Sequence, residues 1–106
     1  MRYGLSDSVI SGLCGVFRQF HDIREVRIFG SRVKGNYKEG SDIDLAITGD
    51  GIIPFEELMD INIRIEDLGL LYKVDLVDYN KNAGTPIREH IDRVGEIFYE
   101  RSDELL

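Results

Sequence analysis

Hydrophobic and polar positions follow two different periods along this chain. Between residues 5 and 20, apolar side chains recur three and four positions apart, which is the spacing of one face of an α-helix. Residues 54–68 and 85–94 show the same spacing, and each of these segments has a proline in its first turn, where that residue fits a helix. The pattern predicts three helices, each with one apolar face.

Four shorter segments are rich in β-branched and aromatic residues and are predicted to be strands: residues 26–29, 43–48, 72–79 and 96–100. The last segment has an alternative, because the helical spacing that begins after Pro86 continues to Glu100. Gly95 favours a helix stop, and the Ile-Phe-Tyr sequence after it favours a strand. We therefore predict a strand there, followed by a tail, residues 101–106, that is frayed or contacts a partner.

The resulting order is helix, strand, loop, strand, helix, strand, helix, strand, which indicates the α/β (α+β) class. The length suits a single domain, residues 1–106, with one sheet of four strands and helices packed against it. The pattern alone does not give the direction of each strand.

Composition narrows the classes of function. Hydrophobic residues make up 42% and charged residues 31% of the chain, as in soluble globular proteins, and no apolar run approaches the roughly 20 residues of a membrane span. The net charge of −7 argues against general nucleic-acid binding, which needs clustered Lys and Arg. The chain has one cysteine, Cys14, and shows no export signal, so we expect a cytoplasmic protein.

Candidate chemistry gathers where the first predicted strand ends and the second begins. Gly30 and Ser31 follow the first strand, and a small turn of this kind offers backbone N–H groups to an anion. After a ten-residue loop come Asp42 and Asp44, which flank Ile43 and so point to the same side of an extended segment. Carboxylates beside phosphate donors suggest chemistry on a nucleotide.

A third carboxylate has the same setting in the next predicted strand. Asp75 lies between Val74 and Leu76, so it would share a sheet face with Asp42 and Asp44 if the two strands were neighbours. Such a cluster repels itself unless a cation binds. Mg²⁺ takes oxygen ligands and keeps positions for substrate phosphates, which suits phosphoryl or nucleotidyl transfer.

Two other motifs that begin at these residues are excluded by the sequence. An EF-hand loop that begins at Asp42 would need an oxygen ligand near Ala46 and a glycine at Ile47. A Walker A loop that begins at Gly30 would need Lys and Ser or Thr where residues 36–37 are Asn and Tyr. The Asp-x-Asp pair taken alone could also be a turn with solvated carboxylates.

In combination, Gly30-Ser31, ten further residues, Asp42-Ile43-Asp44 and a later strand aspartate resemble the signature of the nucleotidyltransferase superfamily that includes DNA polymerase β and kanamycin nucleotidyltransferase. The short length, the Gly-Ser-Arg sequence and the later Val-Asp-Leu-Val-Asp resemble its minimal bacterial and archaeal branch. The resemblance covers nearly the whole chain. It implies the nucleotidyltransferase fold, with a small mixed sheet.

The resemblance also implies roles for the matching residues. Gly30 and Ser31 would hold the triphosphate of a nucleotide, and ATP is the expected substrate. Asp42, Asp44 and Asp75 would be the catalytic carboxylates and the ligands of two Mg²⁺ ions, for which Mn²⁺ can substitute. Asp75 would also help to deprotonate the acceptor hydroxyl.

Two choices in this assignment rest on the residues themselves. Asp75 is preferred to Asp78 because Asp78 lies at the strand end with the opposite parity and should face the other side. Arg32 and Lys34 are further nucleotide-binding candidates, as phosphate partners or as ordinary charges of the loop.

Larger relatives carry another domain that holds the acceptor, and this chain ends soon after its fourth predicted strand. We therefore expect the acceptor on a separately encoded helical substrate-binding protein or HEPN-type toxin, with a homodimer within the complex as a further option. The chain could act as an antitoxin that transfers AMP to a toxin tyrosine, or it could modify a small hydroxylated molecule. The competing hypothesis is a non-catalytic module that binds its partner and senses nucleotide.

Overall fold

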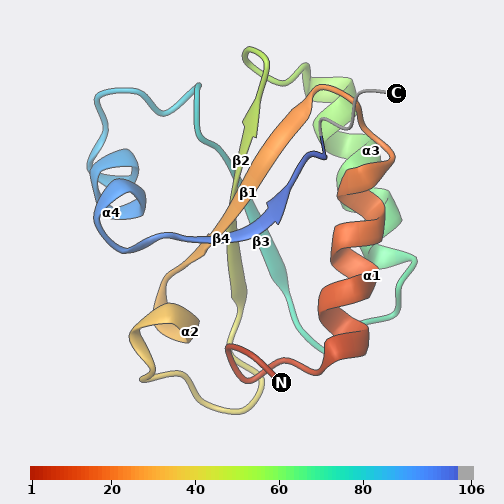
Figure 1. Cartoon of the computed structure of the whole chain (residues 1–106), viewed down its shortest axis with the longest axis vertical. Coiled ribbons are helices and arrows are strands. Elements are labelled where there is room, and N and C mark those ends of the chain that lie inside the picture. Colours follow the sequence, from red (N-terminus) through yellow and green to blue (C-terminus); the bar gives the residue numbers. More distant parts are fainter. Residues whose placement is uncertain (103–106) are drawn as a thin grey trace.

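The computed structural model describes residues 1–102. Its elements, in chain order, are α1 (Asp7–Arg18), β1 (Ile23–Phe29), α2 (Ser31–Lys34), β2 (Ile43–Gly49), α3 (Phe55–Glu66), β3 (Val74–Asp78), α4 (Pro86–Val94) and β4 (Glu96–Glu100). The strands form one mixed sheet in the order β3-β2-β1-β4 (Figure 1). β1 is antiparallel to β2 and β4, whereas β2 and β3 are parallel. The expected fold class is confirmed.

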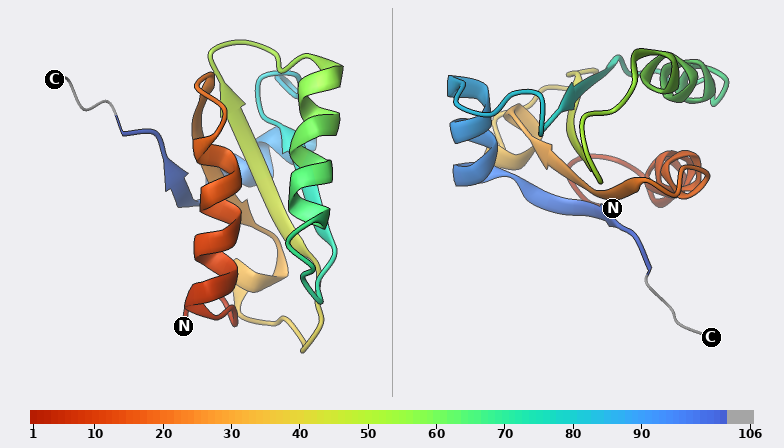
Figure 2. Two further views of the ribbon diagram at one scale, coloured as in Figure 1. Left: turned by 90° about the vertical axis from the view of Figure 1, so that its right-hand side faces the viewer. Right: turned by 90° about the horizontal axis from the view of Figure 1, so that it is seen from above.

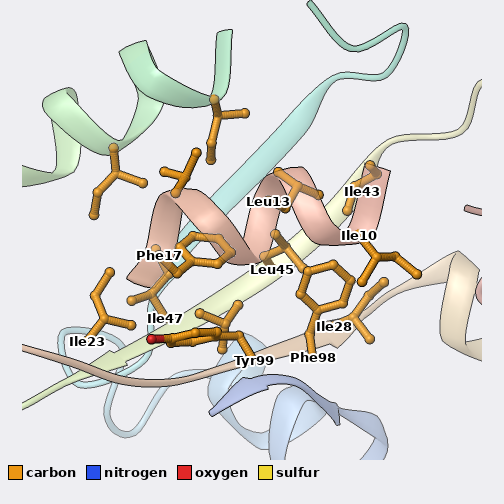
Figure 3. Packing of buried hydrophobic residues seen from close by; sticks show 14 of the residues in the cluster. Ile10, Leu13, Phe17, Ile23, Ile28, Ile43, Leu45, Ile47, Phe98 and Tyr99 are labelled. Carbon is orange, nitrogen blue, oxygen red and sulfur yellow. The ribbon is translucent and has the colours of Figure 1, made fainter. Parts of the chain in front are cut away.

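One face of the sheet is covered by α1 and α3, which lie side by side (Figure 2). Ser6 caps α1 by accepting a hydrogen bond from the Val9 N–H, and Leu13 and Phe17 of that helix are fully buried. They pack against alternate residues of β2, including Leu45 (Figure 3). The apolar faces read from the sequence therefore form the main core, and each such side chain stabilises the fold by about 1.5–3 kcal/mol when fully buried.

The opposite face of the sheet is covered only in part. α4 packs there through Ile91, which contacts Phe29 of β1 and Ala46 of β2 in a second, smaller cluster. Beyond that cluster, Asp44 and Asp75 at the start of β2 and β3 remain half-exposed. The uncovered part of this face is where the candidate site lies.

Several sequence-based boundaries needed correction. α1 spans Asp7–Arg18 rather than 5–20, and α3 spans Phe55–Glu66 rather than 54–68. β1 begins at Ile23 rather than residue 26, because Ile23 is fully buried and pairs with Gly49 across the sheet. β3 spans residues 74–78 rather than 72–79, and the predicted loop contains the one-turn helix α2. Neither the end of a strand nor a single helical turn leaves a clear period in the sequence.

The last strand, β4, is confirmed at residues 96–100. The Gly95 N–H closes α4 with a 2.7 Å hydrogen bond to the Ile91 carbonyl oxygen, and a Cβ at Gly95 would lie only 2.6 Å from that oxygen. A larger residue would therefore disturb the passage from helix to strand. Most of the tail predicted from residue 101, namely residues 103–106, lies outside the described residues. Within residues 1–102, no helix is long and apolar enough to cross a membrane.

Candidate active site

The Gly-Ser turn is built against one of the predicted carboxylates. Gly30 follows β1 with φ +79°, and its neighbour Phe29, the last residue of β1, pairs with Asp44 across the sheet. A Cβ built on Gly30 would lie 2.3 Å from Asp44 Oδ2, so a side chain there would displace the carboxylate. The Gly30 carbonyl then accepts hydrogen bonds from the Val33 and Lys34 N–H groups, which starts α2 at Ser31. The turn and Asp44 are thus a single structural unit.

The third predicted carboxylate lies in the adjacent strand. β2 and β3 are parallel neighbours, and Asp44 pairs directly with Asp75 in their register. Burial raises the pKa of the Asp44 carboxyl above its usual range, and repulsion first from Asp75 and then from Asp42 adds to that rise. The structure therefore places both Asp75 and Asp42 within electrostatic reach of Asp44.

Asp78, the alternative that the sequence analysis set aside, lies on the other side of the sheet. Its buried carboxylate accepts hydrogen bonds from the Ile53 N–H at 2.8 Å and from the Asn80 and Lys81 N–H groups. It fixes the turn after β3 and the segment before α3. The parity argument that separated it from Asp75 is confirmed.

The two basic candidates in the loop have different environments. Arg32 is buried, and its guanidinium donates 2.8 Å hydrogen bonds to the carbonyl oxygens of Tyr3 and Ser41. It also lies over the rings of Tyr37 and Tyr72, 5.1 and 4.8 Å from their centroids. These contacts favour a structural role for Arg32. Lys34 is exposed on α2, where its ammonium can reach an anion.

One charged neighbour of the site was missed at the sequence level. Lys73 Nζ lies 3.6 Å from Asp75 Oδ1, in an ion pair that is largely exposed. The sequence could have identified Lys73, because it is two positions from Asp75, and side chains two positions apart in an extended segment point to the same side. Lys73 is therefore a positive charge placed next to the acid that would face an acceptor.

The comparison with protein families gives one decisive match. The model described as "Polymerase beta, Nucleotidyltransferase" matches residues 13–104, nearly the whole chain. The chain belongs to this nucleotidyltransferase family. The comparison with curated proteins gives no match.

Solved structures support the same fold. A toxin–antitoxin crystal structure with AMP-PNP is 21% identical, with a TM-score of 0.70 over 92% of this chain and 76% of that one. A complex of a tri-AMPylated HEPN toxin with its MNT antitoxin from Shewanella oneidensis is 17% identical, with a TM-score of 0.66 over 91% and 73%. A nucleotidyltransferase-like structure from Sulfolobus solfataricus is 22% identical, with a TM-score of 0.52 over 97% and 96%.

The residues of this nucleotidyltransferase fit a divalent cation by their chemistry. All three candidate ligands are carboxylates, which suits Mg²⁺. Burial first, and then repulsion from Asp75 and Asp42, raises the pKa of Asp44, and a bound cation would offset both effects. Within residues 1–102, no group of three or more His, Cys, Asp and Glu side chains is arranged so that it could hold a metal ion. The remaining positions would go to nucleotide phosphates and water, as Mg²⁺ sites commonly arrange.

Proposed function

We propose that this nucleotidyltransferase transfers AMP from ATP, in a metal-dependent reaction, to a hydroxyl group held by a separate helical protein. The observation that carries the proposal is the pairing of Asp44 with Asp75 beside Gly30. It brings carboxylates from two strands to the turn that would hold the triphosphate. Asp44 and Asp75 lie on the part of the sheet that α4 leaves uncovered.

Each candidate residue would bind either the nucleotide or the metal ion. Backbone N–H groups after Gly30 and the Ser31 hydroxyl would hold the triphosphate, with Lys34 as a further phosphate contact. Asp42, Asp44 and Asp75 would hold Mg²⁺, which when bound neutralises charge on the phosphates during transfer.

Transfer itself is an in-line displacement. The acceptor oxygen forms a bond to the α-phosphorus while the bond to the bridging oxygen breaks, and pyrophosphate leaves. Asp75 would accept the proton of the hydroxyl, since it is the half-exposed carboxylate on the outer strand of the sheet.

Two structural neighbours suggest the identity of the acceptor. One structural neighbour is a HEPN toxin that carries AMP groups in complex with an MNT antitoxin, and another toxin–antitoxin structure contains AMP-PNP. We propose the corresponding role here: an antitoxin that modifies a tyrosine of a HEPN-type partner in the cytoplasm. A small hydroxylated molecule held by such a partner would use the same site.

The test combines the chain with ATP, Mg²⁺ and the helical protein encoded beside it. Intact-mass spectrometry should show the partner gaining AMP, and Asp44→Asn should reduce the rate by at least about 100-fold. Asp50→Asn, which removes one charge near the opposite end of β2, is the matched control and should retain the rate. If Asp44→Asn leaves the product undiminished, the metal assignment is wrong.

A second readout does not depend on the partner. Mn²⁺ with AMP-PNP should raise the melting temperature of the native chain and of Asp50→Asn, but not of Asp44→Asn. The non-catalytic hypothesis predicts a different pattern: the Asp42→Asn/Asp44→Asn double variant would still neutralise the partner as well as the native chain does.

A further inference from the structure

The outer face of α3 carries an unusual concentration of exposed apolar side chains. Phe55, Met59 and Ile63 follow one another at four-residue spacing and are 73, 47 and 52% exposed. They form a stripe along the helix, on a side different from the one that buries Ile61 and Ile65. Six of the ten large hydrophobics that are exposed among the described residues lie between positions 52 and 71: Ile52, Phe55, Met59, Ile63, Leu68 and Leu71.

This stripe borders a groove that runs towards the catalytic end of the sheet. The groove, of about 610 Å³, lies between α3 and the edge strand β3 and is lined by Met59 and Ile63 on one side and by Tyr72, Lys73 and Val74 on the other. Val74 immediately precedes Asp75, and Lys73 forms the ion pair with it. A segment seated in the groove would therefore reach Lys73 at the edge of the sheet, and the Lys73 ammonium lies against Asp75 on the other face.

The surroundings of the stripe are acidic. Residues 55–67 contain five carboxylates and one guanidinium, and that guanidinium, Arg64, is paired with Asp60 at 3.0 Å. No ion pair joins Glu56, Glu66 or Asp67 to another described residue, and all three are exposed. An apolar stripe bordered by unpaired acids fits an apolar helix bordered by Lys and Arg.

We infer that the α3 stripe and its groove are the docking surface for a basic, amphipathic helix of the acceptor-bearing partner. Apolar side chains of that helix would cover Phe55, Met59 and Ile63, and its basic residues would meet the free carboxylates. One end of the helix would then lie next to Lys73, the ion-pair partner of Asp75 at the edge of the sheet. This inference rests on the proposed function for the identity of the partner, and it adds the surface and the chemistry that recognise it.

The test measures binding of the neighbour-encoded helical protein by calorimetry without nucleotide. Ile63→Arg should weaken binding at least about 30-fold, as expected for a central interface residue. Ile97→Arg is the matched control, because Ile97 is a 40% exposed isoleucine on β4, at the opposite edge of the sheet. Both variants should melt within a few degrees of the native chain, since both side chains are solvent-exposed. Loss of binding in Ile97→Arg with retention in Ile63→Arg would overturn the inference.

Charge provides an independent check. The triple variant Glu56→Gln/Glu66→Gln/Asp67→Asn should slow association several-fold at low salt and flatten its dependence on salt. An unchanged salt dependence would overturn the acidic part of the inference. If the isolated native chain were a dimer that Ile63→Arg converts to a monomer, the surface would belong to a second copy and the inference would fail.

The docking surface and the proposed reaction can fail separately. Asp44→Asn should bind the partner as tightly as the native chain while failing to transfer AMP. Binding that depends on Ile63, without any transfer by the native chain, would leave the docking surface standing and remove the proposed function. If Ile63→Arg transferred AMP as fast as the native chain, the proposed function would stand and the docking surface would be removed.

Discussion

At the scale of single residues, the site depends on the space that Gly30 leaves for Asp44. The positive φ of Gly30 would strain an alanine there, and the alanine Cβ would also collide with Asp44 Oδ2. Gly35 has a similar φ, +84°, with no atom within 4 Å of its would-be Cβ. An alanine at either glycine would strain the backbone, but only an alanine at Gly30 would also collide with the Asp44 carboxylate. A comparison of the two substitutions therefore distinguishes the two effects.

We expect Gly30→Ala to lower the free energy of unfolding by about 2 kcal/mol or more, and Gly35→Ala by about 1 kcal/mol, because only the first adds a steric collision to the strain. Urea denaturation measures both values. Gly30→Ala should also impair AMP transfer more than Gly35→Ala does. Equal effects of the two variants on stability and transfer would contradict the contact between Gly30 and Asp44.

We expect the ionised Asp44 side chain to lower the free energy of unfolding of the chain without ligand. Its raised pKa means that the folded state holds the proton more tightly than the unfolded state, so stability falls as pH rises from the ordinary pKa through the raised one. Asp44→Asn should therefore melt at the same or a higher temperature than the native chain at pH 7, and this gain should vanish below about pH 4. Asp67→Asn, an exposed acid without an ion pair, is the control. A clear fall in melting temperature for Asp44→Asn would contradict the like-charge cluster.

At the scale of elements, α3 meets the turn before β1 through two acids. Glu57 in the first turn of α3 has a buried Oε2 without a hydrogen-bond partner among residues 1–102. Burial raises the pKa of the Glu57 carboxyl to about 7, and the neighbouring Asp22 carboxylate adds to that rise. Protonation of Glu57 thus stabilises the packing of α3 against this turn.

This arrangement predicts a pH-dependent stability. The folded protein binds the Glu57 proton up to about pH 7 and the unfolded chain only up to about pH 4.5, so stability should fall between these values as pH rises. Glu57→Gln should remove that slope and add about 1 kcal/mol at pH 8, the value being reduced by the partial exposure of the side chain. Chemical denaturation at pH 5 and pH 8 measures the difference. Glu56→Gln, an exposed neighbour, should leave the slope in place.

At the scale of the whole molecule, Arg32 joins segments that are distant in sequence. Its guanidinium donates hydrogen bonds to the carbonyls of Tyr3 and Ser41 and lies over the rings of Tyr37 and Tyr72. It therefore links the N-terminal segment and the loop before Asp42 to the segment that enters β3. Arg32 therefore supports the site through the fold, without the need for a phosphate contact.

We expect Arg32→Met to lower the free energy of unfolding by about 2–4 kcal/mol, because two part-buried carbonyl oxygens lose a charged donor. Lys34→Met, on the exposed side of α2, should change stability by less than about 0.5 kcal/mol and should weaken ATP binding instead. Urea denaturation and nucleotide titration distinguish the two. Unchanged stability with weaker ATP binding in Arg32→Met would identify Arg32 as a phosphate partner.

Local patterns in the sequence were sufficient for the elements and for the faces they present. The period of three to four gave the helices, and alternation along the strands put Ile43 and Leu45 in the core and Asp44 on the other side. Parity also distinguished Asp75 from Asp78, since successive side chains of a strand point to opposite faces. These properties depend on neighbours along the chain and need no knowledge of the rest of the fold.

The tertiary structure alone decided which of these pieces meet. That β3 lies parallel to β2, with Asp75 opposite Asp44, follows from strand pairing between distant segments, which no local period encodes. The burial of Arg32, the ion pair of Lys73 and the groove beside α3 likewise arise from contacts across the sheet and its helices. The sequence determined which residues are candidates for the chemistry, and long-range packing determined their arrangement.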